Sequence, residues 1–408
     1  MRQNDQLKLL MKRIQQSVYE QRGVSSTKAD IHQAIQNLDK GLFPGAFCKI
    51  LPDILAGSPH HCNILHHDTA GTKAGLAHLV WKLTGNLEAV AGVAVDALVM
   101  NTDDVGCVGA INGLIVNQAI GRNGFLIPGE VIQVIIESAE RFCQMLSKWG
   151  VPCFFAGGET ASVGDIVRTV DVGSSVVVRM RRRDVIDASR MVPGDIIVGF
   201  SSTGRATYEN EDNSGIGANG LTNARHDTLR PLYRRYRETY APEMSKKLVY
   251  RGRYKIDDPL PQDSKFWIWK ALLSPTRTYM PLIKLVLENV NRRHIHGIIH
   301  CSGGGQTKIV KFGRHGNRYV KKNLFPVPPL FQMLQEVSGL LWKEMYQTYN
   351  MGHRLEMAVP DNETANELIA ISRHFKIDAQ VVGEVRPKLG PGPNKVVIES
   401  PYGTFEYL

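Results

Sequence analysis

The chain has 408 residues, a formal net charge of +10, and 43% hydrophobic residues. This size allows two or more domains with cores of their own, and a charged fraction of 22% argues against wholesale disorder. The positive charge suits anionic partners, either nucleic acid or small phosphorylated metabolites, and does not separate the two. No apolar run approaches the roughly 20 residues of a membrane span, no signal-peptide core is present, and the six cysteines form no C-x-x-C pair. We therefore expect a cytoplasmic protein without membrane partners.

The first half of the chain alternates between strand and helix patterns. Apolar residues at helical spacing predict helices over 5–20 and 132–146, and the run 86–105 is apolar but punctuated by aspartates. Residues 21–62 are loop-like. Short apolar runs predict strands at 63–67, 151–156 and 172–180.

The second half repeats this alternation after a polar link at 181–194. We place a domain boundary there, with one domain over 1–185 and a second over 186–408. Strands are predicted at 196–200, 297–301, 355–359, 378–385 and 396–399, and helices at 276–292, 329–348 and 361–375. Such alternation predicts an α/β or α+β fold class.

Three glycine-punctuated segments each follow a predicted strand and carry charged or hydroxyl groups. They are 67–73 (HDTAGTK), 157–160 (GGET) and 300–305 (HCSGGG). Glycine lets backbone N–H groups approach a ligand closely, carboxylates suit a metal ion, and lysine or hydroxyl groups suit a phosphate. Together the segments predict one site for a metal–polyphosphate, assembled from distant parts of the chain.

Carboxylates near these segments are the candidate magnesium ligands. If 96–104 is helical, Asp96 and Asp103 are two turns apart and share a face, about 10 Å apart along the axis. Asp104 lies beside that face, and Asp68 and Glu159 on separate loops could complete the cluster. The alternative for each is a solvated surface carboxylate or a helix cap.

Lys73 and His300 each have two interpretations. Gly71-Thr72-Lys73 lacks the residue order of a P-loop, so Lys73 either neutralises a phosphate or is an exposed lysine at a helix start. His300 ends a predicted strand and either contacts a substrate or is satisfied within its loop. The pairs His60-His61 and His66-His67 are poor metal ligands, because neighbours on a strand point to opposite faces.

Residues 225–255 combine many Lys and Arg residues with five tyrosines. Such interleaving suits phosphate contacts and base stacking. No nucleic-acid-binding motif accompanies it, so a solvated surface insertion is the preferred interpretation and a nucleic-acid partner is disfavoured.

These motifs, in this order, resemble the phosphoribosylformylglycinamidine cyclo-ligase (aminoimidazole ribonucleotide, or AIR, synthetase) family over most of the chain. The matching elements are Asp68, Gly71, Thr72 and Lys73; Asp103 and Asp104; Gly157, Gly158, Glu159 and Thr160; Asn219 and Gly220; Pro275, Thr276 and Arg277; His300 with Gly303, Gly304 and Gly305; and Asn350, Met351 and Gly352.

The resemblance implies an AIR synthetase-like fold of two α/β domains. In this fold the N-terminal mixed sheets with their helices pack together in a homodimer, and the C-terminal domain is an α/β sandwich. It also implies ATP, Mg²⁺ and a small ribose-phosphate substrate. In the implied reaction of purine biosynthesis, ATP phosphorylates the formyl amide oxygen of formylglycinamidine ribonucleotide, an internal nitrogen attacks the activated carbon, and phosphate departs.

The resemblance also implies roles for individual residues. The metal ligands would be Asp68, Asp96, Asp104 and Glu159, and the catalytic residues Asp68, Lys73, Asp104, Glu159 and His300. The nucleotide would contact Gly71, Thr72, Lys73, Asp103, Gly157, Gly158 and Thr160 as well as the metal ligands. The substrate would contact Asn219, Gly220, Thr276, Arg277, His300, Gly303, Gly304 and Gly305.

Three departures from the family pattern concern the acceptor substrate. A family lysine is replaced by Glu20, with Arg22 or Lys28 as possible substitutes, a family histidine by Gly217, and small or apolar residues by His353-Arg354. Two alternatives therefore remain beside the cyclo-ligase. One is an ATP-dependent enzyme of the same superfamily that activates another acceptor, and the other is a non-catalytic, nucleic-acid-associated relative.

Overall fold

Two β-sheets organise the protein. The structure, a computed structural model, describes residues 17–25, 29–387, 390 and 392–408. The first sheet has five strands in the order β1-β2-β5-β3-β4, and the second has seven in the order β12-β11-β8-β10-β6-β9-β7. Mixed strand directions and many helices confirm the predicted α/β (α+β) class. Residues 182–195 connect the two sheets, while the domain boundary at 185/186 stays a prediction.

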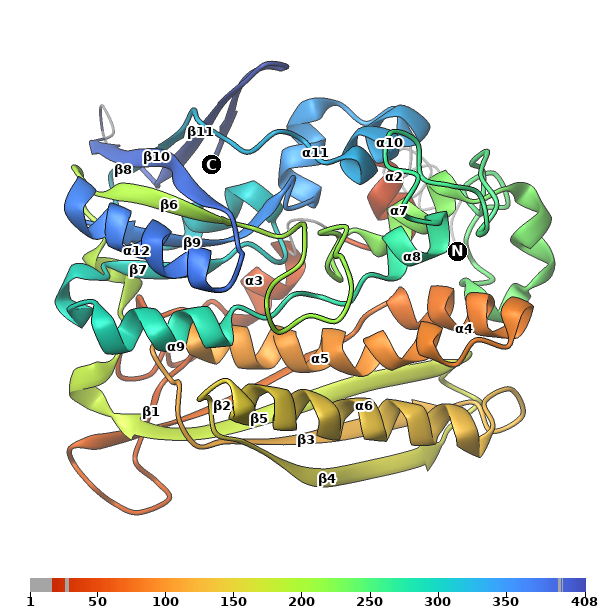
Figure 1. The fold of residues 1–408 in the computed structure, drawn as a ribbon, viewed down its shortest axis with the longest axis horizontal. Helices are drawn as coiled ribbons and strands as arrows, with labels where there is room; N and C mark the ends of the chain where they lie inside the picture. Colours follow the sequence, from red (N-terminus) through yellow and green to blue (C-terminus); the bar gives the residue numbers. More distant parts are fainter. Residues whose placement is uncertain (1–16, 26–28, 388–389, 391) are drawn as a thin grey trace, which may run out of the picture.

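The first half contains the five-stranded sheet and its helices. The strands are β1 (Leu51–Pro52), β2 (His61–Thr69), β3 (Leu114–Arg122), β4 (Cys153–Ser162) and β5 (Val170–Arg181), and the helices are α2 (Val18–Gln21), α3 (Ala29–Ile35), α4 (Lys73–Thr84), α5 (Glu88–Gly106) and α6 (Gly129–Lys148). Helices α5 and α6 cover one face of this sheet (Figure 1). Along strand β3, buried and exposed residues alternate, so one face of the sheet packs against these helices and the other does not.

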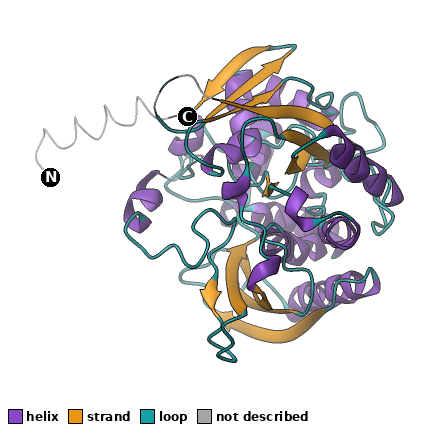
Figure 2. Cartoon of the chain, turned by 90° about the vertical axis from the view of Figure 1, so that its left-hand side faces the viewer, coloured by secondary structure: helices purple, strands orange, loops and turns teal. Residues whose placement is uncertain are grey.

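The other face of the five-stranded sheet is open. The curved sheet forms the lower edge of the molecule in Figure 2. Leu65, Val177, Ile115 and Phe154 are cross-strand neighbours on this face, and Leu65, Ile115 and Phe154 are 63%, 50% and 59% exposed. The row is therefore apolar and largely uncovered within the described chain.

The second half contains the seven-stranded sheet. Its strands are β6 (Ile196–Ser201), β7 (Gly297–His300), β8 (Asn317–Lys321), β9 (His353–Val359), β10 (Ala379–Pro387), β11 (Lys395–Ser400) and β12 (Gly403–Tyr407). Its helices are α7 (Leu221–Thr228), α8 (Ile268–Leu273), α9 (Met280–Asn289), α10 (Pro329–Ser338), α11 (Trp342–Thr348) and α12 (Asn362–His374).

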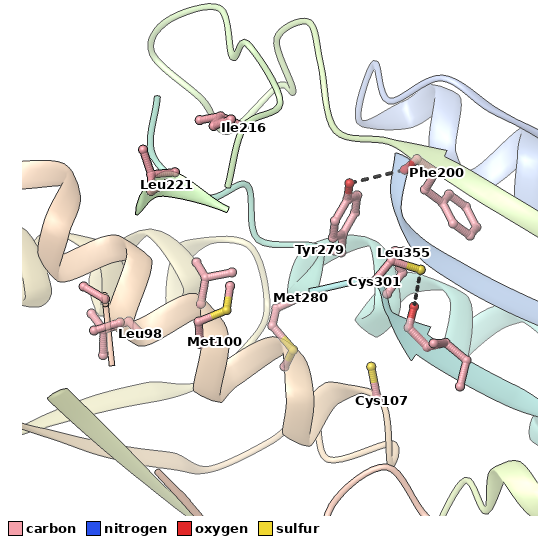
Figure 3. Close-up of a cluster of buried hydrophobic side chains, with 14 of the residues drawn as sticks. Leu98, Met100, Cys107, Phe200, Ile216, Leu221, Tyr279, Met280, Cys301 and Leu355 are labelled. Atoms are coloured by element: carbon pink, nitrogen blue, oxygen red, sulfur yellow. Dashed lines mark hydrogen bonds between the residues drawn. The ribbon is translucent and has the colours of Figure 1, made fainter. Parts of the chain in front are cut away.

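Helix α5 lies between the two halves and is buried along nearly its whole length. Met100 and Cys107 approach Met280 of α9, and Tyr279 reaches the carbonyl oxygen of Phe200 (Figure 3). Gly106 permits this contact, because a Cβ there would lie 2.5 Å from the Met280 sulfur. Asp96, Asp103 and Asp104 on α5 are therefore all buried.

Several elements differ from the sequence predictions. The predicted helix 5–20 lies largely outside the described residues, and α3 interrupts the predicted loop 21–62. The helix predicted over 276–292 begins only at Met280, and the one over 329–348 divides at Gly339, whose φ is +69°. Strands β1, β3, β8 and β12 were not predicted. Among the described helices, none combines the length and apolarity needed to cross a membrane.

Candidate active site

Helix α5 carries three of the predicted carboxylates. Asp96 and Asp103 both receive hydrogen bonds from the extended segment 275–279, as their two-turn spacing predicts. Asp104, one position further, faces β7 instead. One helix therefore directs its carboxylates to two different places.

Asp96 belongs to a buried group that we call the closed cluster: Lys73, Asp96 and Thr276. The Lys73 ammonium lies 2.9 Å from Asp96 Oδ1 and donates to the carbonyl oxygens of Ser274 (2.6 Å) and Gly217 (3.3 Å). Thr276 donates to the same carboxylate oxygen from its backbone N–H and its hydroxyl, at 2.8 and 2.6 Å. The pKa of Lys73 is lowered and that of Asp96 raised, chiefly because both groups are buried.

The contacts of the closed cluster bear on three expected roles. All three N–H donors of Lys73 are occupied, so none is left for a phosphate. Asp96 is fully buried and its Oδ2 has no partner among the described residues, so its expected role as a metal ligand stays a prediction. Thr276 holds Asp96 and also lines a cavity of about 550 Å³, so its expected contact with a substrate stays a prediction. These residues join the two halves of the protein.

Asp103 performs a similar structural task. Its carboxylate accepts hydrogen bonds from the Thr278 hydroxyl at 2.6 Å and the Tyr279 backbone N–H at 2.7 Å. The side chain is fully buried, and burial raises its pKa. Asp103 therefore holds segment 275–279 against α5, and its expected contact with a nucleotide stays a prediction.

Asp104 and His300 form what we call the open pair. His300 Nδ1 lies 2.7 Å from Asp104 Oδ1, across 196 residues of sequence. His300 Nε2 is buried and has no partner among the described residues. His66 Nε2 lies 3.6 Å from the other Asp104 oxygen. A histidine held at one nitrogen by a carboxylate and free at the other has the arrangement of a general acid or base.

His66 and Asn101 are site residues that the sequence interpretation missed. His66 Nδ1 lies 2.9 Å from Asn101 Oδ1, and the Asn101 amide donates to the backbone oxygen of Asp68 at 3.4 Å. His67 points to the open face, where its Nδ1 lies 2.9 Å from Ser175 Oγ. The expected opposite orientation of the histidine pair is confirmed, and the alternation itself indicated that His66 faces the helices.

Two helix amino ends meet beside Asp68. Thr72 precedes α4, Gly220 precedes α7, and the hydroxyls of Thr72 and Thr222 lie 2.7 Å apart. Neither N-cap makes a side-chain capping bond. Because helix amino ends present unpaired N–H groups, this junction suits a phosphate.

The glycine run 303–305 lies against Asn219. A Cβ at Gly303 would be 3.6 Å from Asn219 Oδ1, so these two predicted substrate residues are neighbours. Gly304 has φ +97°, and a side chain on Gly305 would collide with the carbonyl oxygens of Tyr346 and Tyr349. The run is therefore a tight loop that leaves backbone exposed beside Asn219.

Arg277 was expected at the substrate, and in the structure it borders a cavity of about 550 Å³ while its guanidinium is used by neighbouring protein groups. Its guanidinium binds both Glu209 carboxylate oxygens, at 2.9 and 2.6 Å, and donates to three backbone oxygens of residues 201–204. All of its donors are engaged and its side chain is buried. Arg277 anchors segment 201–209, which is a structural role.

The GGET segment is not a loop. Strand β4 continues through it, and its pairing with β3 shifts register there. Gly157 has φ +79°, and a Cβ on Gly158 would overlap the Gln118 carbonyl, so the glycines form a β-bulge. The segment therefore brings backbone against backbone instead of cradling a ligand.

Glu159 is separated from the other carboxylates. Cross-strand pairs place it three strands away from Thr69, or about 14 Å, on the open face of the sheet. Among the described residues no group of three or more His, Cys, Asp or Glu is placed to hold a metal ion. The expected set of Asp68, Asp96, Asp104 and Glu159 is thus not assembled within this chain.

Gly217 and Arg354, two positions where the chain departs from the family pattern, lie next to each other in the structure. Gly217 has φ +68°, and a Cβ there would lie 2.7 Å from Arg354 Nη1. Arg354 is buried, stacks over Tyr279 and donates to the backbone oxygen of Arg277. A fixed cation therefore fills the space beside Gly217.

Arg22 is not the substitute for a missing lysine. It binds Asp227 through two nitrogens, at 2.9 and 2.6 Å, and Asn223 at 2.6 Å. The other possible substitute, Lys28, lies outside the described residues.

In the 225–255 insertion, Tyr233, Tyr240 and Tyr250 pack together, while Tyr236 and Tyr254 are half-buried beside Arg235 and Arg253. Tyr250 packs against His226, Tyr233 and Tyr240, and its hydroxyl lies 2.7 Å from Thr239 Oγ1. Arg225 is buried and donates to the Thr239 carbonyl. Three of the rings that would stack on bases instead form a small core, so the insertion is a folded structural unit.

Solved structures identify the fold class. Over 93% of this chain and 98% of the other, the structure matches the crystal structure of a HypE-HypF complex with a TM-score of 0.56 and 16% identity. It matches AaThiL complexed with AMPPCP and TMP over 94% and 96% of the two chains, with a TM-score of 0.51 and 12% identity. Thermotoga maritima phosphoribosylformylglycinamidine synthase II gives 0.52 and 16% identity, over 92% of this chain and 47% of that one. The protein has the AIR synthetase-like fold.

Sequence comparison shows similarity to several enzymes that share one name. The chain is 27% identical over 327 residues to the phosphoribosylformylglycinamidine cyclo-ligase of Methanococcus vannielii, covering 80% of this chain and 78% of that protein. The enzyme of the same name from Thermococcus kodakarensis is 28% identical over 320 residues, 78% of each chain. No family model matches the chain.

Proposed function

We propose that the protein is a phosphoribosylformylglycinamidine cyclo-ligase, which uses ATP to close the imidazole ring of aminoimidazole ribonucleotide and releases ADP and phosphate. The open pair is the observation that carries this proposal. Asp104 and His300 come from the two halves of the protein and leave one buried imidazole nitrogen free, beside the loops that suit phosphates. The similarity to enzymes of that name over four fifths of the chain supports it.

The ATP phosphates would bind at the amino ends of α4 and α7. Asp68 supports this assignment, because it is exposed beside these ends and its carboxylate receives only the Thr69 N–H among the described contacts. A magnesium ion that arrives with a triphosphate needs only one or two protein carboxylates, and Asp68 and Asp104 suit that task. The ion would neutralise charge on the transferred phosphoryl group.

The ribose phosphate of the substrate would bind where Asn219 meets the run 303–305. The backbone there is exposed and bears no side chains, which suits close approach by phosphate oxygens. This position places the reacting end of the substrate toward the open pair.

The chemistry then follows from charge and geometry. The formyl amide oxygen takes the γ-phosphoryl group from ATP and becomes a good leaving group. The internal amine attacks the activated carbon, the C–O bond breaks, and phosphate departs. His300 Nε2 receives the proton that the amine loses, and Asp104 stabilises the resulting imidazolium.

A second candidate is an ATP-dependent enzyme that activates another acceptor. Arg354 favours it, because a permanent cation fills the space beside Gly217 and would change which acceptor fits there. The reaction would still pass through a phosphorylated oxygen.

We also propose that two copies pair through the open face of the five-stranded sheet. The apolar row of Leu65, Val177, Ile115 and Phe154 supports this, because a monomer rarely exposes such a continuous stripe. The variant I115D/F154D should sediment as a monomer, whereas L341D, which changes an exposed leucine elsewhere, should not alter the oligomeric state. A parent protein that is monomeric at micromolar concentration would contradict this pairing.

The decisive assay supplies the purified protein with ATP, Mg²⁺ and formylglycinamidine ribonucleotide. We expect aminoimidazole ribonucleotide, ADP and phosphate in equal amounts, and no turnover when magnesium is chelated. ADP release that does not depend on this substrate would favour the second candidate. The same assay on D68A and E159A tests which carboxylate serves the nucleotide.

A further inference from the structure

A second concave site lies at the opposite end of the five-stranded sheet. Its cavity of about 400 Å³ is lined by Pro59, His60, His61, Arg181, Arg182 and Arg183. His61 and Arg181 form the first cross-strand pair of β2 and β5, whereas the phosphate-facing junction follows the last pair, at Thr69. Eight residues of strand separate the two, or about 26 Å, so this cavity is distinct from the candidate active site.

The arginines of this cavity have little carboxylate neutralisation within the described part of the chain. The preceding Arg179 is neutralised by Asp53, with distances of 2.9 to 3.1 Å. Among the described residues, no carboxylate lies within 4 Å of Arg181 or Arg182, and Arg183 reaches only Asp184, at 3.9 Å. Three guanidinium groups around one cavity create a strong local positive potential.

The wall of the cavity is held in place before any ligand arrives. Asp53 accepts from the Ser58 backbone and the Asn63 amide, and His61 Nδ1 lies 2.9 Å from Ser58 Oγ. Arg182 Nε donates to the His61 carbonyl at 2.8 Å, and within the described part of the chain no hydrogen bond uses its two terminal nitrogens. A partly fixed wall reduces the entropy lost when an anion binds.

We propose that this site binds a small polyphosphate, that is, a pyrophosphate group either free or carried by a nucleotide. Arginine forks match phosphate oxygens in pairs, and several forks around one cavity suit a multiply charged anion. The cavity has the volume of a small-molecule site and is bounded by Pro59, which favours a compact ligand over an extended nucleic-acid strand.

Histidine NMR gives a local test. Protein labelled with ¹³C-histidine is titrated with inorganic pyrophosphate at about 0.15 M ionic strength, where weak surface attraction is screened. The signals of His60 and His61, assigned with H60Q and H61Q, should shift and saturate. Separate titrations with ADP and ATP identify the source, because tighter binding of a nucleotide than of pyrophosphate shows that the base contributes.

Two charge-reversal variants test whether the arginines of this cavity bind the pyrophosphate. R181E/R183E should weaken the pyrophosphate response of His60 and His61 by about tenfold or more, since it removes charge-assisted hydrogen bonds. K246E/K247E changes the same net charge at exposed residues elsewhere and should leave that response unchanged. R181Q/R183Q repeats the test should the reversal variant fold poorly. Ring closure should be unaffected in all of them.

Three results would overturn the site. They are shifts of His60 and His61 that never saturate, equal weakening by the arginine and lysine variants, and tighter competition by an oligonucleotide than by pyrophosphate or a nucleotide.

Discussion

Asp96 and Asp104 lie on the same helix, about 12 Å apart, yet their surroundings give them different tasks. In the closed cluster, Asp96 is fully buried and contacts Thr276 and Lys73, whose three N–H donors are all used. In the open pair, Asp104 meets a histidine whose second nitrogen is free. The comparison teaches that a carboxylate in a suggestive motif is a candidate for chemistry only when its partner retains an unused donor or acceptor.

The largest effect on stability should come from removing Asp96 from the closed cluster. D96A leaves the Lys73 ammonium buried without its counter-charge, which should lower the free energy of unfolding by about 3–5 kcal/mol. Urea denaturation measures it. The control is D68A, an exposed carboxylate, which should change stability by less than about 0.5 kcal/mol.

The open pair should show the reverse behaviour. H300Q should lower kcat for ring closure by about 100-fold, because it removes the free imidazole nitrogen, and should destabilise the protein less than D96A does. Loss of stability as large as that of D96A, or activity close to that of the parent, would show that His300 is structural.

A third buried ionic group sharpens the comparison through pH. Glu356 Oε1 contacts Lys321 and lies 2.9 Å from His353 Nε2, and despite burial these partners lower the pKa of Glu356 to about 2. Its stabilising contribution is complete above the unfolded pKa, near 4.5, and falls as pH drops toward 2.

The stability difference between the parent and E356Q should therefore shrink by about 2 kcal/mol between pH 6 and pH 3. Urea unfolding at several pH values measures the difference. A constant difference across this range would mean that Glu356 is not held ionised by its partners.

The smallest effect on stability should come from Thr276, which donates to Asp96 in the closed cluster. T276V removes one hydroxyl donor to Asp96 while the backbone N–H remains, so unfolding should become easier by about 1 kcal/mol. Differential scanning calorimetry detects this change. An effect as large as that of D96A would assign the cluster's stability to the hydroxyl and not to the ion pair.

The sequence predicted elements well where one periodicity dominates. Helix α6 shows a clean helical spacing of apolar residues, and β5 is a long run of strand-forming residues, so both were predicted. Strand β3 was missed although its alternation is regular, because Asn117 and Gln118 interrupt its apolar character. Segment 275–279 was expected to be helical and is extended, because Asp96 and Asp103 bind its backbone and hydroxyl groups.

The sequence by itself determined the α/β class, the motifs that mark the likeness to the cyclo-ligases, and the shared face of Asp96 and Asp103. These depend on local spacing and residue type, which any reader of the chain can count. Only the tertiary structure decided that Lys73, Asp96 and Arg277 are occupied by structural partners, that His300 keeps one nitrogen free, and that Glu159 lies on the open face. Those outcomes depend on which distant groups meet, and hydrogen-bonding capacity spent on a neighbour is not visible in a motif.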